Sequence, residues 1–392
     1  MPPRLLYLGD VPVESSYHGS ALLYRLLQRY PAERLNIVEG NLLPTRTDRR
    51  LPGVMYRTLT VGRSRLLNTR FHNLYSRWLL MGARRRAAKV RGLLDNFSPE
   101  AVLTVGHGYS WLTAAQFAAD AKLPLHLIVH DDWPSIVAPW LRPSVDRAFA
   151  DVIRQAASLL CSSPFMCEDY ARRYGRTGML LLPYRAADAP VFSGVAERLQ
   201  RWNGAPVFAF AGTINSPGYA MLLRSLAAAI AKHNGKVLIF GPLTREGATA
   251  AGLDLPNIAL GGLLKADELL TRLRAEADVL FVPMSFAPEE RVNMRMGFPA
   301  KLTDYTAVGL PMLIVGPDDC GAVTWARRHP GVAEVVASDA VGDLEPAIAR
   351  LAGDAAHRVR LARTAQEIGN REFSSATADA IFQSALLSAV SN

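Results

Sequence analysis

The chain has 392 residues, of which 49% are hydrophobic and 20% are charged, and its net charge is +9. This length exceeds what one hydrophobic core usually serves, so we expect two domains. No apolar run reaches the roughly 18 residues that span a bilayer, and the start lacks the apolar stretch of a signal peptide. The three cysteines match no metal spacing and suit a reducing compartment. We therefore expect a cytoplasmic protein rather than a secreted or membrane-spanning one.

Short apolar runs alternate with helical patterns, which indicates parallel sheets covered by helices. In the first half, strands are predicted over residues 4–8, 35–38, 101–105, 125–129, 158–161 and 179–182. In the second half, they are predicted over residues 207–212, 237–241, 258–260, 279–282 and 312–315. The predicted α/β fold has a Rossmann-like domain over residues 1–185, a linker over 186–205, a second Rossmann-like domain over 206–365 and a helical segment over 366–392.

The loop after the first predicted strand, residues 15–20, contains Gly19 shortly before a predicted helix. A loop of this kind can cradle a diphosphate at the helix N-terminus. The alternative is an ordinary helix start capped by Ser20.

Residues 49–94 contain no Asp or Glu, while Arg and Lys accumulate among Leu and aromatic residues. Arg77, Trp78 and the run Arg84, Arg85, Arg86 typify this pattern, which suits an interfacial helix on anionic lipid or a lipid-linked acceptor. A solvated face over a packed helix is the alternative. Nucleic acid would need the same charge, but no recognised nucleic-acid motif accompanies it, so none is expected.

Residues 297–311 put a loop, a short helix and a strand in the order that binds anions. Pro299 suits the first turn and Gly309 suits a left-handed stop, so a helix of roughly nine residues is predicted. Lys301 and Asp304 lie three residues apart on one face, which places a cation near a phosphate and a carboxylate near a ribose diol. The alternative is a surface ion pair.

The run Pro-Ala-Lys-Leu-Thr-Asp-Tyr-Thr-Ala-Val-Gly-Leu-Pro resembles the donor-site motif of retaining glycosyltransferases with the GT-B fold, the large family-four type. The resemblance implies two Rossmann-like domains facing across a cleft, with a C-terminal helix returning to the N-terminal domain. It also implies a nucleotide-sugar donor in the cleft, with no bound metal and no cofactor. Asp304 would hold the ribose, while Lys301 and the backbone near Gly297 and Phe298 would hold the diphosphate.

The resemblance extends to the strand end at His130, Asp131 and Asp132. It implies that His130 lies near the reacting sugar and that Asp131 or Asp132 contacts sugar or acceptor hydroxyls. The rival interpretation is a metal site formed by the adjacent carboxylates. In the family, the loop that corresponds to Gly19 faces the donor and the acceptor.

The loop after the first strand of the second half departs from the family pattern. It begins Gly212-Thr213, where the family commonly has Gly-Arg, and the family's lysine falls at Pro217 or Gly218. Arg291, Arg295 and Lys301 are the available replacements for the missing cations. Glu289 and Glu290 lie near the place of a second family glutamate, and the stretch that includes Leu263 resembles the one that holds the base.

The predicted function is hexosyl transfer from a nucleotide sugar to a hydroxyl acceptor. Retention of configuration and a role in cell-surface polysaccharide or glycolipid synthesis are expected, with peripheral binding to the inner face of the plasma membrane. Two alternatives stay open: a non-catalytic GT-B scaffold or partner, favoured by the missing Arg and Lys, and a sugar-nucleotide epimerase or hydrolase.

Overall fold

A computed structural model describes residues 1–392 except 16–17, 202–204, 215 and 388–392. Ser16, Tyr17, Asn215 and Ser391, which belong to segments discussed above, lie outside the described residues. The chain forms two compact units. The first comprises Met1–Leu182 together with Ser375–Asn392, and the second comprises Pro183–Ser374.

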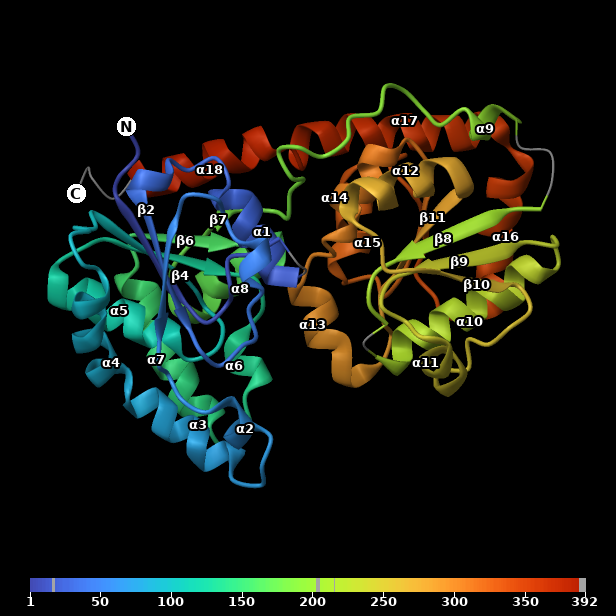
Figure 1. Cartoon of the computed structure of the whole chain (residues 1–392). Coiled ribbons are helices and arrows are strands. Elements are labelled where there is room, and N and C mark those ends of the chain that lie inside the picture. Colours follow the sequence, from blue (N-terminus) through green and yellow to red (C-terminus); the bar gives the residue numbers. More distant parts are fainter. Residues whose placement is uncertain (16–17, 202–204, 215, 388–392) are drawn as a thin grey trace. The chain divides into compact units, whose positions relative to one another are not determined.

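The first unit is built on a seven-stranded parallel sheet with the order β3-β2-β1-β4-β5-β6-β7 (Figure 1). Its strands are β1 (Leu5–Gly9), β2 (Leu35–Gly40), β3 (Met55–Leu59), β4 (Ala101–Val105), β5 (Leu125–Val129), β6 (Ser158–Cys161) and β7 (Met179–Leu180). Its helices are α1 (His18–Leu27), α2 (Ser64–Leu67), α3 (His72–Met81), α4 (Ala83–Val90), α5 (Ser110–Ala121), α6 (Trp133–Ile136), α7 (Arg142–Gln155), α8 (Pro164–Tyr174) and α18 (Ser375–Leu387).

The second unit is built on a six-stranded parallel sheet with the order β10-β9-β8-β11-β12-β13. Its strands are β8 (Val207–Ala211), β9 (Lys236–Phe240), β10 (Ile258–Gly262), β11 (Val279–Pro283), β12 (Met312–Val315) and β13 (Glu334–Val336). Its helices are α9 (Arg198–Arg201), α10 (Pro217–Ala231), α11 (Arg245–Ala250), α12 (Ala266–Glu276), α13 (Arg291–Met296), α14 (Lys301–Val308), α15 (Gly321–Arg328), α16 (Val341–Gly353) and α17 (Ala355–Glu372).

Both sheets reverse their strand order once, as Rossmann folds do, and this reversal decides where ligands can bind. The reversal falls between β1 and β4 in the first unit and between β8 and β11 in the second. In open parallel sheets, ligands bind beyond the carboxyl ends of the strands at such a point. The loops after these four strands are therefore the places to look for a site in each unit.

The central strands are buried on both faces, which explains their near-continuous apolar sequences. All five residues of β1, β4, β5 and β11 are buried. Helices cover both faces of each sheet, and in the second unit α10 and α16 pack on one side, with Leu226 and Ile348 fully buried. Such packing fixes the strand ends from which the candidate side chains project.

Two edge strands, β3 and β13, are absent from the sequence prediction. β3 carries Arg57 and is largely exposed, and β13 has only three residues, so neither shows a buried apolar run. The basic segment is therefore not one helix, because it begins with β3 and continues through α2, α3 and α4.

The segment expected as a linker, residues 186–205, lies against the second unit. Ala196 N donates to Gly309 O at 2.9 Å, and Arg198 Nε donates to Asp278 Oδ1 at 2.6 Å. Arg274 donates to Val195 O at 3.1 Å. These bonds hold the described part of the segment along α12 and α14.

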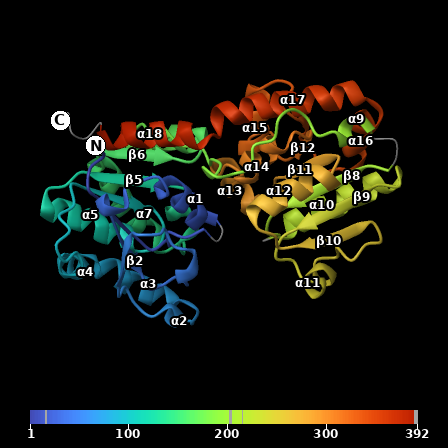
Figure 2. The same ribbon diagram turned by 45° about the horizontal axis from the view of Figure 1, so that its top comes forward.

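Up to residue 387, where the described part ends, the last segment of the chain contains parts of two helices rather than one. α17 belongs to the second unit and ends at Glu372, while α18 belongs to the first unit. α18 lies along α1 and β6, as Figures 1 and 2 both show, and its buried Phe382 ring is 6.5 Å from the ring of Tyr30. Among the described helices, none is both long and apolar enough to cross a membrane.

Candidate functional site

The best-defined candidate site of the second unit is the start of α14, beside the end of β8. Helix α14 spans Lys301–Val308, and Gly309 ends it in the left-handed conformation with φ 75°, as its sequence predicts. Tyr305 lies one turn into the helix, and its hydroxyl oxygen accepts from Ala211 N, at the end of β8, at 2.6 Å. This bond fixes the first turn of α14 next to the strand-order reversal of the sheet.

Lys301 is a half-buried cation without a counter-ion. Its Nζ lies 4.2 Å from the Phe210 ring centroid and 5.3 Å from that of Tyr219. Among the described residues, no carboxylate or hydrogen-bond acceptor meets it. Burial lowers the pKa of Lys301 to about 7, because the described part of the ligand-free site has no negative charge that would keep this ammonium protonated.

The backbone at the start of α14 also has unused donors. Within the described part of the chain, no acceptor pairs with the N–H groups of Phe298, Ala300 and Lys301, as expected for a first helical turn. Together with the helix dipole, these groups and Lys301 favour an anion.

Gly297 and the side chain of Phe298 hold the start of α14 in place, while no acceptor among the described residues takes the Phe298 N–H. The N–H of Gly297 donates to Asn293 O at 2.8 Å and closes α13, and the φ of Gly297 is an ordinary −80°. The Phe298 side chain is buried, with its ring centroid 5.8 Å from that of Phe373 and 6.2 Å from that of Trp325. Both residues therefore anchor the start of α14.

Asp304 lies half-buried one turn into α14, on the same face as Lys301. Thr303 Oγ1 lies 3.4 Å from Asp304 Oδ1. Arg185 lies close enough to interact electrostatically with Asp304, and burial lowers the pKa of Arg185 to about 10. Arg185 itself is held by Thr303 O at 2.8 Å and Thr306 Oγ1 at 2.9 Å, so it positions this helix.

The loop after β8 explains the missing lysine of the family pattern. Gly212 has φ 147°, a conformation that favours glycine, and a Cβ there would lie in ordinary contact with Lys301, 3.8 Å away. A Cβ on Gly218 would lie 2.0 Å from Ser285 Oγ and 3.0 Å from Glu290 Oε2. A lysine cannot occupy position 218 without displacing these groups. Thr213, in the place of the family's arginine, is exposed.

Glu290 is brought to this loop by a three-residue 3-10 helix, Pro288–Glu290. Its Oε2 accepts from Ser216 Oγ at 3.0 Å, and Ser216 caps α10. The sequence placed Glu290 only near a family glutamate and gave no sign of its contact with Ser216.

The remaining residues expected at the donor site lie on the surface. Arg291 is exposed and forms an ion pair with Asp319 at 3.3 Å, so a carboxylate already uses its charge. Arg295 is exposed near the end of α13. Leu263 is 69% exposed and follows Gly262, the last residue of β10.

In the first unit, His130 follows β5 directly and contacts the first turn of α1. Its Nδ1 would lie 3.3 Å from a Cβ on Gly19, so glycine there makes room for the imidazole. Burial lowers the pKa of His130 to about 4, with Asp131 opposing and His107 adding to this effect. The imidazole is therefore neutral at pH 7.

His107, which the sequence analysis missed, completes a polar cluster with His130 and Asp131. It follows β4, and its Nδ1 lies 3.8 Å from the exposed Asp131 carboxylate. Burial lowers the pKa of His107, and Asp131 partly opposes the shift. The signal was available in Gly106-His107-Gly108, a polar residue at the carboxyl end of a buried strand.

Asp132, in contrast, has a structural role. Its carboxylate accepts from Arg173 at 2.6 Å and from Tyr170 at 3.0 Å, and Ser135 Oγ also donates to it. These bonds leave it unavailable for a substrate or a metal. Among the residues that the structure describes, no group of three or more His, Cys, Asp and Glu side chains is placed to hold a metal ion.

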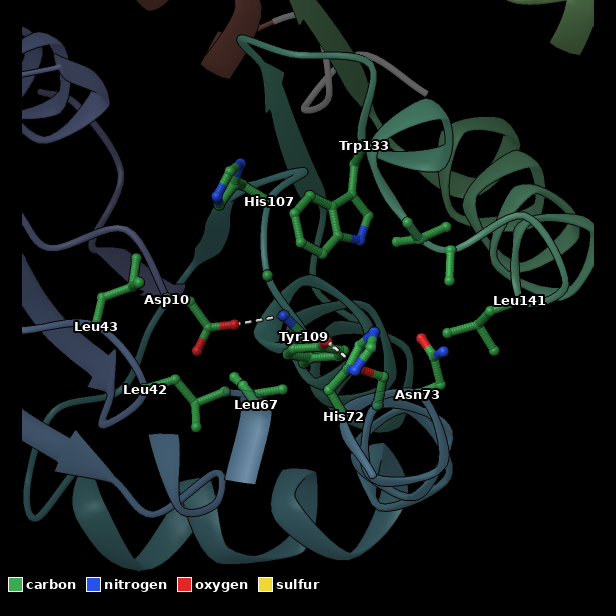
Figure 3. A pocket seen from close by; sticks show the side chains of 14 residues that line it. Asp10, Leu42, Leu43, Leu67, His72, Asn73, His107, Tyr109, Trp133 and Leu141 are labelled. Atoms are coloured by element: carbon green, nitrogen blue, oxygen red, sulfur yellow. Dashed lines mark hydrogen bonds between the residues drawn. The ribbon is translucent and has the colours of Figure 1, made fainter. Parts of the chain in front are cut away.

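A cavity of about 420 Å³ opens at the strand-order reversal of the first unit (Figure 3). It lies between the loops after β1, β2, β4 and β5 and the helices α2 and α3, and His107 forms part of its wall. Asp10 is buried there, and its oxygens accept from Ser110 N and Ser110 Oγ at 2.7 Å each, and from Tyr109 N. The cavity therefore adjoins the polar cluster of His107, Asp131 and His130.

The basic segment presents one apolar stripe and several free cations. Leu74, Trp78 and Met81 recur every three to four residues along α3 and are 67%, 55% and 68% exposed. Arg77, Arg84 and Arg85 are exposed, and none pairs with a carboxylate of the described residues.

Arg86, predicted to share this surface, is buried instead. Its Nε donates to Thr113 Oγ1 at 3.0 Å, and burial lowers its pKa. The prediction was wrong for this residue, since the turn of α4 directs it toward α5 while Arg84 and Arg85 point to solvent.

No protein-family model matches the chain, and no curated protein sequence matches it. Solved structures do. Anabaena Alr3699/HepE, in complex with UDP and glucose, superposes with a TM-score of 0.69 at 16% identity, covering 98% of this chain and 99% of that one. Sucrose-phosphate synthase from Thermosynechococcus elongatus has a TM-score of 0.66 at 16% identity, covering 98% of each chain.

The trehalose 6-phosphate synthase of Burkholderia multivorans has a TM-score of 0.66 at 15% identity and covers 100% of this chain and 97% of its own. These proteins share the GT-B architecture. The chain therefore has the GT-B fold.

Proposed function

We propose that the protein is a glycosyltransferase that moves a sugar from a nucleotide-sugar donor to a hydroxyl acceptor. The observation that carries this proposal is the start of α14. There an unpaired cation, Lys301, joins free backbone N–H groups, with the carboxylate of Asp304 one turn along the same face. A diphosphate suits the first two and a ribose diol suits the third.

Several solved structures of the same fold support a uridine nucleotide. HepE was crystallised with UDP and with UDP-glucose. We propose a UDP-sugar as the donor of this chain, held by Lys301, Asp304 and the backbone around β8 and β10.

The polar cluster of His107, His130 and Asp131 handles the reacting hydroxyl groups in this proposal. A neutral imidazole such as His130 can accept a hydrogen bond from a hydroxyl group and act on it as a general base. We expect His130→Ala to lower kcat strongly while leaving the stabilisation by nucleotide unchanged.

Thermal unfolding with UDP, UDP-glucose, GDP and ADP tests the donor site. A ligand at 100 times its Kd stabilises a protein by about 2.7 kcal/mol. We expect a rise in Tm with one nucleotide, and its loss in Asp304→Ala. Asp254→Ala, which removes an exposed carboxylate outside this site, is the matched control. No rise with any of the four would instead support a non-catalytic scaffold, and release of free sugar without a glycoside product would support a hydrolase.

We also propose that the transfer needs no bound metal and retains the configuration of the sugar. Lys301 and the helix N-terminus supply positive charge for the leaving diphosphate, which is the task of a metal in other transferases. Retention rests on the resemblance of the α14 motif to retaining enzymes. Activity that persists in EDTA, and a product anomer matching the donor by NMR, are the expected results.

A third part of the proposal is peripheral binding to an anionic membrane surface, in the service of cell-surface polysaccharide or glycolipid synthesis. The stripe of Leu74, Trp78 and Met81 supplies apolar contact, and the unpaired Arg77, Arg84 and Arg85 supply charge. Each basic residue near such a surface contributes about 1 kcal/mol.

Vesicle co-sedimentation tests the membrane surface. Replacing Arg77, Arg84 and Arg85 by Gln is expected to weaken binding to vesicles rich in anionic lipid roughly a hundredfold at low salt. Arg147→Gln, an exposed arginine on α7, should have little effect. Equal binding by the triple variant and the wild type would exclude this surface.

A further inference from the structure

The cavity of the first unit has an apolar interior, although it opens beside polar loops. Six aliphatic side chains line it: Leu42, Leu43, Leu67, Val137, Ala138 and Leu141. In Figure 3, the labelled Leu42 and Leu43 approach from one side and Leu141 from the other. At about 420 Å³ it falls in the range of pockets that enclose small organic ligands.

The buried polar groups Asp10, Ser76 and Tyr109 of this cavity already have hydrogen-bond partners. Asp10 accepts from the backbone and hydroxyl of Ser110, and Ser76 Oγ lies 2.7 Å from the Tyr109 hydroxyl. A sugar ring against the six aliphatic side chains would lose water without finding partners there for its hydroxyls, which costs free energy for every unpaired group. A hydrocarbon chain would lose nothing of this kind and would gain contact with the aliphatic wall.

Besides His72 and Asn73 on α3, the polar groups of the wall with unused hydrogen-bonding capacity lie together at Trp133 and His107. The indole nitrogen of Trp133 is shielded from water and has no hydrogen-bond partner among the described residues. The Trp133 ring packs against His107, with 4.7 Å between the ring centroids, and His107 in turn approaches Asp131. A molecule with an apolar part in the cavity and a polar end at His107 would satisfy both regions.

The helix that forms one wall also carries the apolar stripe of the surface. Asn73 and Ser76 of α3 line the cavity, while Leu74 and Trp78 of the same helix are exposed. Leu67 at the end of α2 lines the cavity, while its neighbour Leu66 is 39% exposed. The apolar surface and the cavity are thus two faces of one helical segment, bordered by unpaired arginines.

We propose that this cavity holds the hydrocarbon chain of a lipid-linked acceptor, with its polar end at His107 and Asp131. The inference rests on the proposed glycosyl transfer and adds the substrate class. A lipid that is drawn from an anionic surface suits the charge of the α2–α4 segment, which has no acidic residue between Arg49 and Leu94.

Calorimetric titration of the full chain with n-hexyl, n-octyl and n-decyl β-glucosides, below their micelle concentrations, tests the cavity. Each buried methylene contributes about 0.8 kcal/mol, so affinity should rise about fourfold per methylene until the cavity is full. Ala138→Phe fills the cavity and should abolish the dependence on chain length. Ala119→Phe, on an exposed position of α5, should leave it unchanged.

If Ala138→Phe does not fold, as judged by circular dichroism and Tm, Val137→Phe blocks the same space from the neighbouring position. Affinity that is independent of chain length in the wild type, or an unchanged dependence in the blocked variants, would overturn the assignment.

A second measurement separates this inference from the proposed function. The stabilisation by nucleotide should persist in Ala138→Phe, while transfer of sugar to the decyl glucoside should fall in proportion to its lost binding. Binding of the glucosides without nucleotide binding would refute the transferase and leave an apolar pocket. Binding of both without transfer would mean that the cavity holds a membrane lipid, and the acceptor assignment would be wrong.

Discussion

Lys301 is placed to bind an anionic ligand, but its burial lowers the stability of the ligand-free protein. Its ammonium is half-buried over Phe210 and Tyr219 and has no counter-ion among the described residues. Its pKa falls from 10.5 to about 7 because burial disfavours the charged form. The folded protein therefore binds this proton more weakly than the unfolded chain does.

From this follows a prediction about stability. Without ligand, stability should rise as the pH rises from 7 toward 10.5, where the unfolded chain still holds a proton that the folded protein has lost. Lys301→Met should stabilise the ligand-free protein by about 1 to 2 kcal/mol near pH 7, after allowance for solvent screening. The same variant should lose its response to nucleotide.

Urea unfolding of both proteins with and without nucleotide measures these effects. Lys236→Met is the control that should change neither quantity. Lys236 is exposed at the start of β9, while Lys301 lies near the end of β8. A Lys301→Met protein that still responds to nucleotide would remove Lys301 from the donor site.

Two histidines of the first unit make its stability depend on pH in the acidic range. Burial lowers the pKa of both His126 and His130 from 6.5 to about 4. Between these values the unfolded chain takes up protons that the folded protein refuses, so stability falls as the pH falls from about 6.5 to 4. From pH 6 to 5, the loss is about 1 kcal/mol for the fully buried His126 and less for half-buried His130.

Denaturant unfolding at pH 7, 6 and 5 checks this dependence. His126→Gln should flatten the profile more than His130→Gln does, because His126 is fully buried and hydrogen-bonded to Ser158 at 2.8 Å. An unchanged profile in both variants would show that other groups dominate the acid response.

At the scale of elements, α14 is fixed at both ends, and this makes the candidate donor site rigid. Tyr305 ties its first turns to β8, and Gly309 ends it in a left-handed turn packed beneath the segment at residues 194–196. A Cβ on Gly309 would lie 2.7 Å from Gly194 O and 2.7 Å from Arg274 Nη1. Glycine is needed there for both conformation and space.

A comparison of two glycines separates these causes. Gly309 and Gly262 both have φ 75°, but a Cβ on Gly262 would meet nothing within 4 Å. Gly262→Ala should cost only the left-handed strain, about 1 to 2 kcal/mol. Gly309→Ala should cost at least about 1 kcal/mol more, since the methyl group is overpacked. Equal losses in equilibrium unfolding would show that the surroundings of Gly309 yield freely.

In helix α4, the exposure of each arginine decides whether it can contribute to the proposed membrane surface. Positions 84, 85 and 86 are all arginine, yet only Arg86 points inward, where it donates to Thr113. Helical periodicity shows only that three consecutive residues point in three different directions. Which of these directions is buried depends on where α5 lies.

At the scale of the whole molecule, the end of the chain completes the first unit. α18 follows the second unit in sequence but lies along α1 and β6, with Phe382 almost fully buried (Figure 2). The first unit therefore cannot finish folding until the whole chain is available.

We expect Phe382→Ala to destabilise the first unit by about 3 to 5 kcal/mol, because it removes a large buried side chain. Hydrogen exchange should rise across the amides of β1, β6 and α1 and stay unchanged in the second unit. Leu387→Ala, at the exposed end of α18, is the control and should have little effect. A uniform rise in both units would show that they unfold together.

The sequence by itself determined the architecture, because strands that are buried on both faces have nearly continuous apolar sequences. It also located α14 through Gly309 and the motif before it, although the helix begins at Lys301, two residues after Pro299. The edge strands β3 and β13 escaped prediction, since β3 has only one buried residue and β13 is only three residues long. Only the tertiary structure decided which polar residues are free. It assigned Asp132 to Arg173, buried Arg86, brought Glu290 to Ser216, and joined His107 to His130 and Asp131. Each of these depends on contacts between residues far apart in the chain, which no local pattern records.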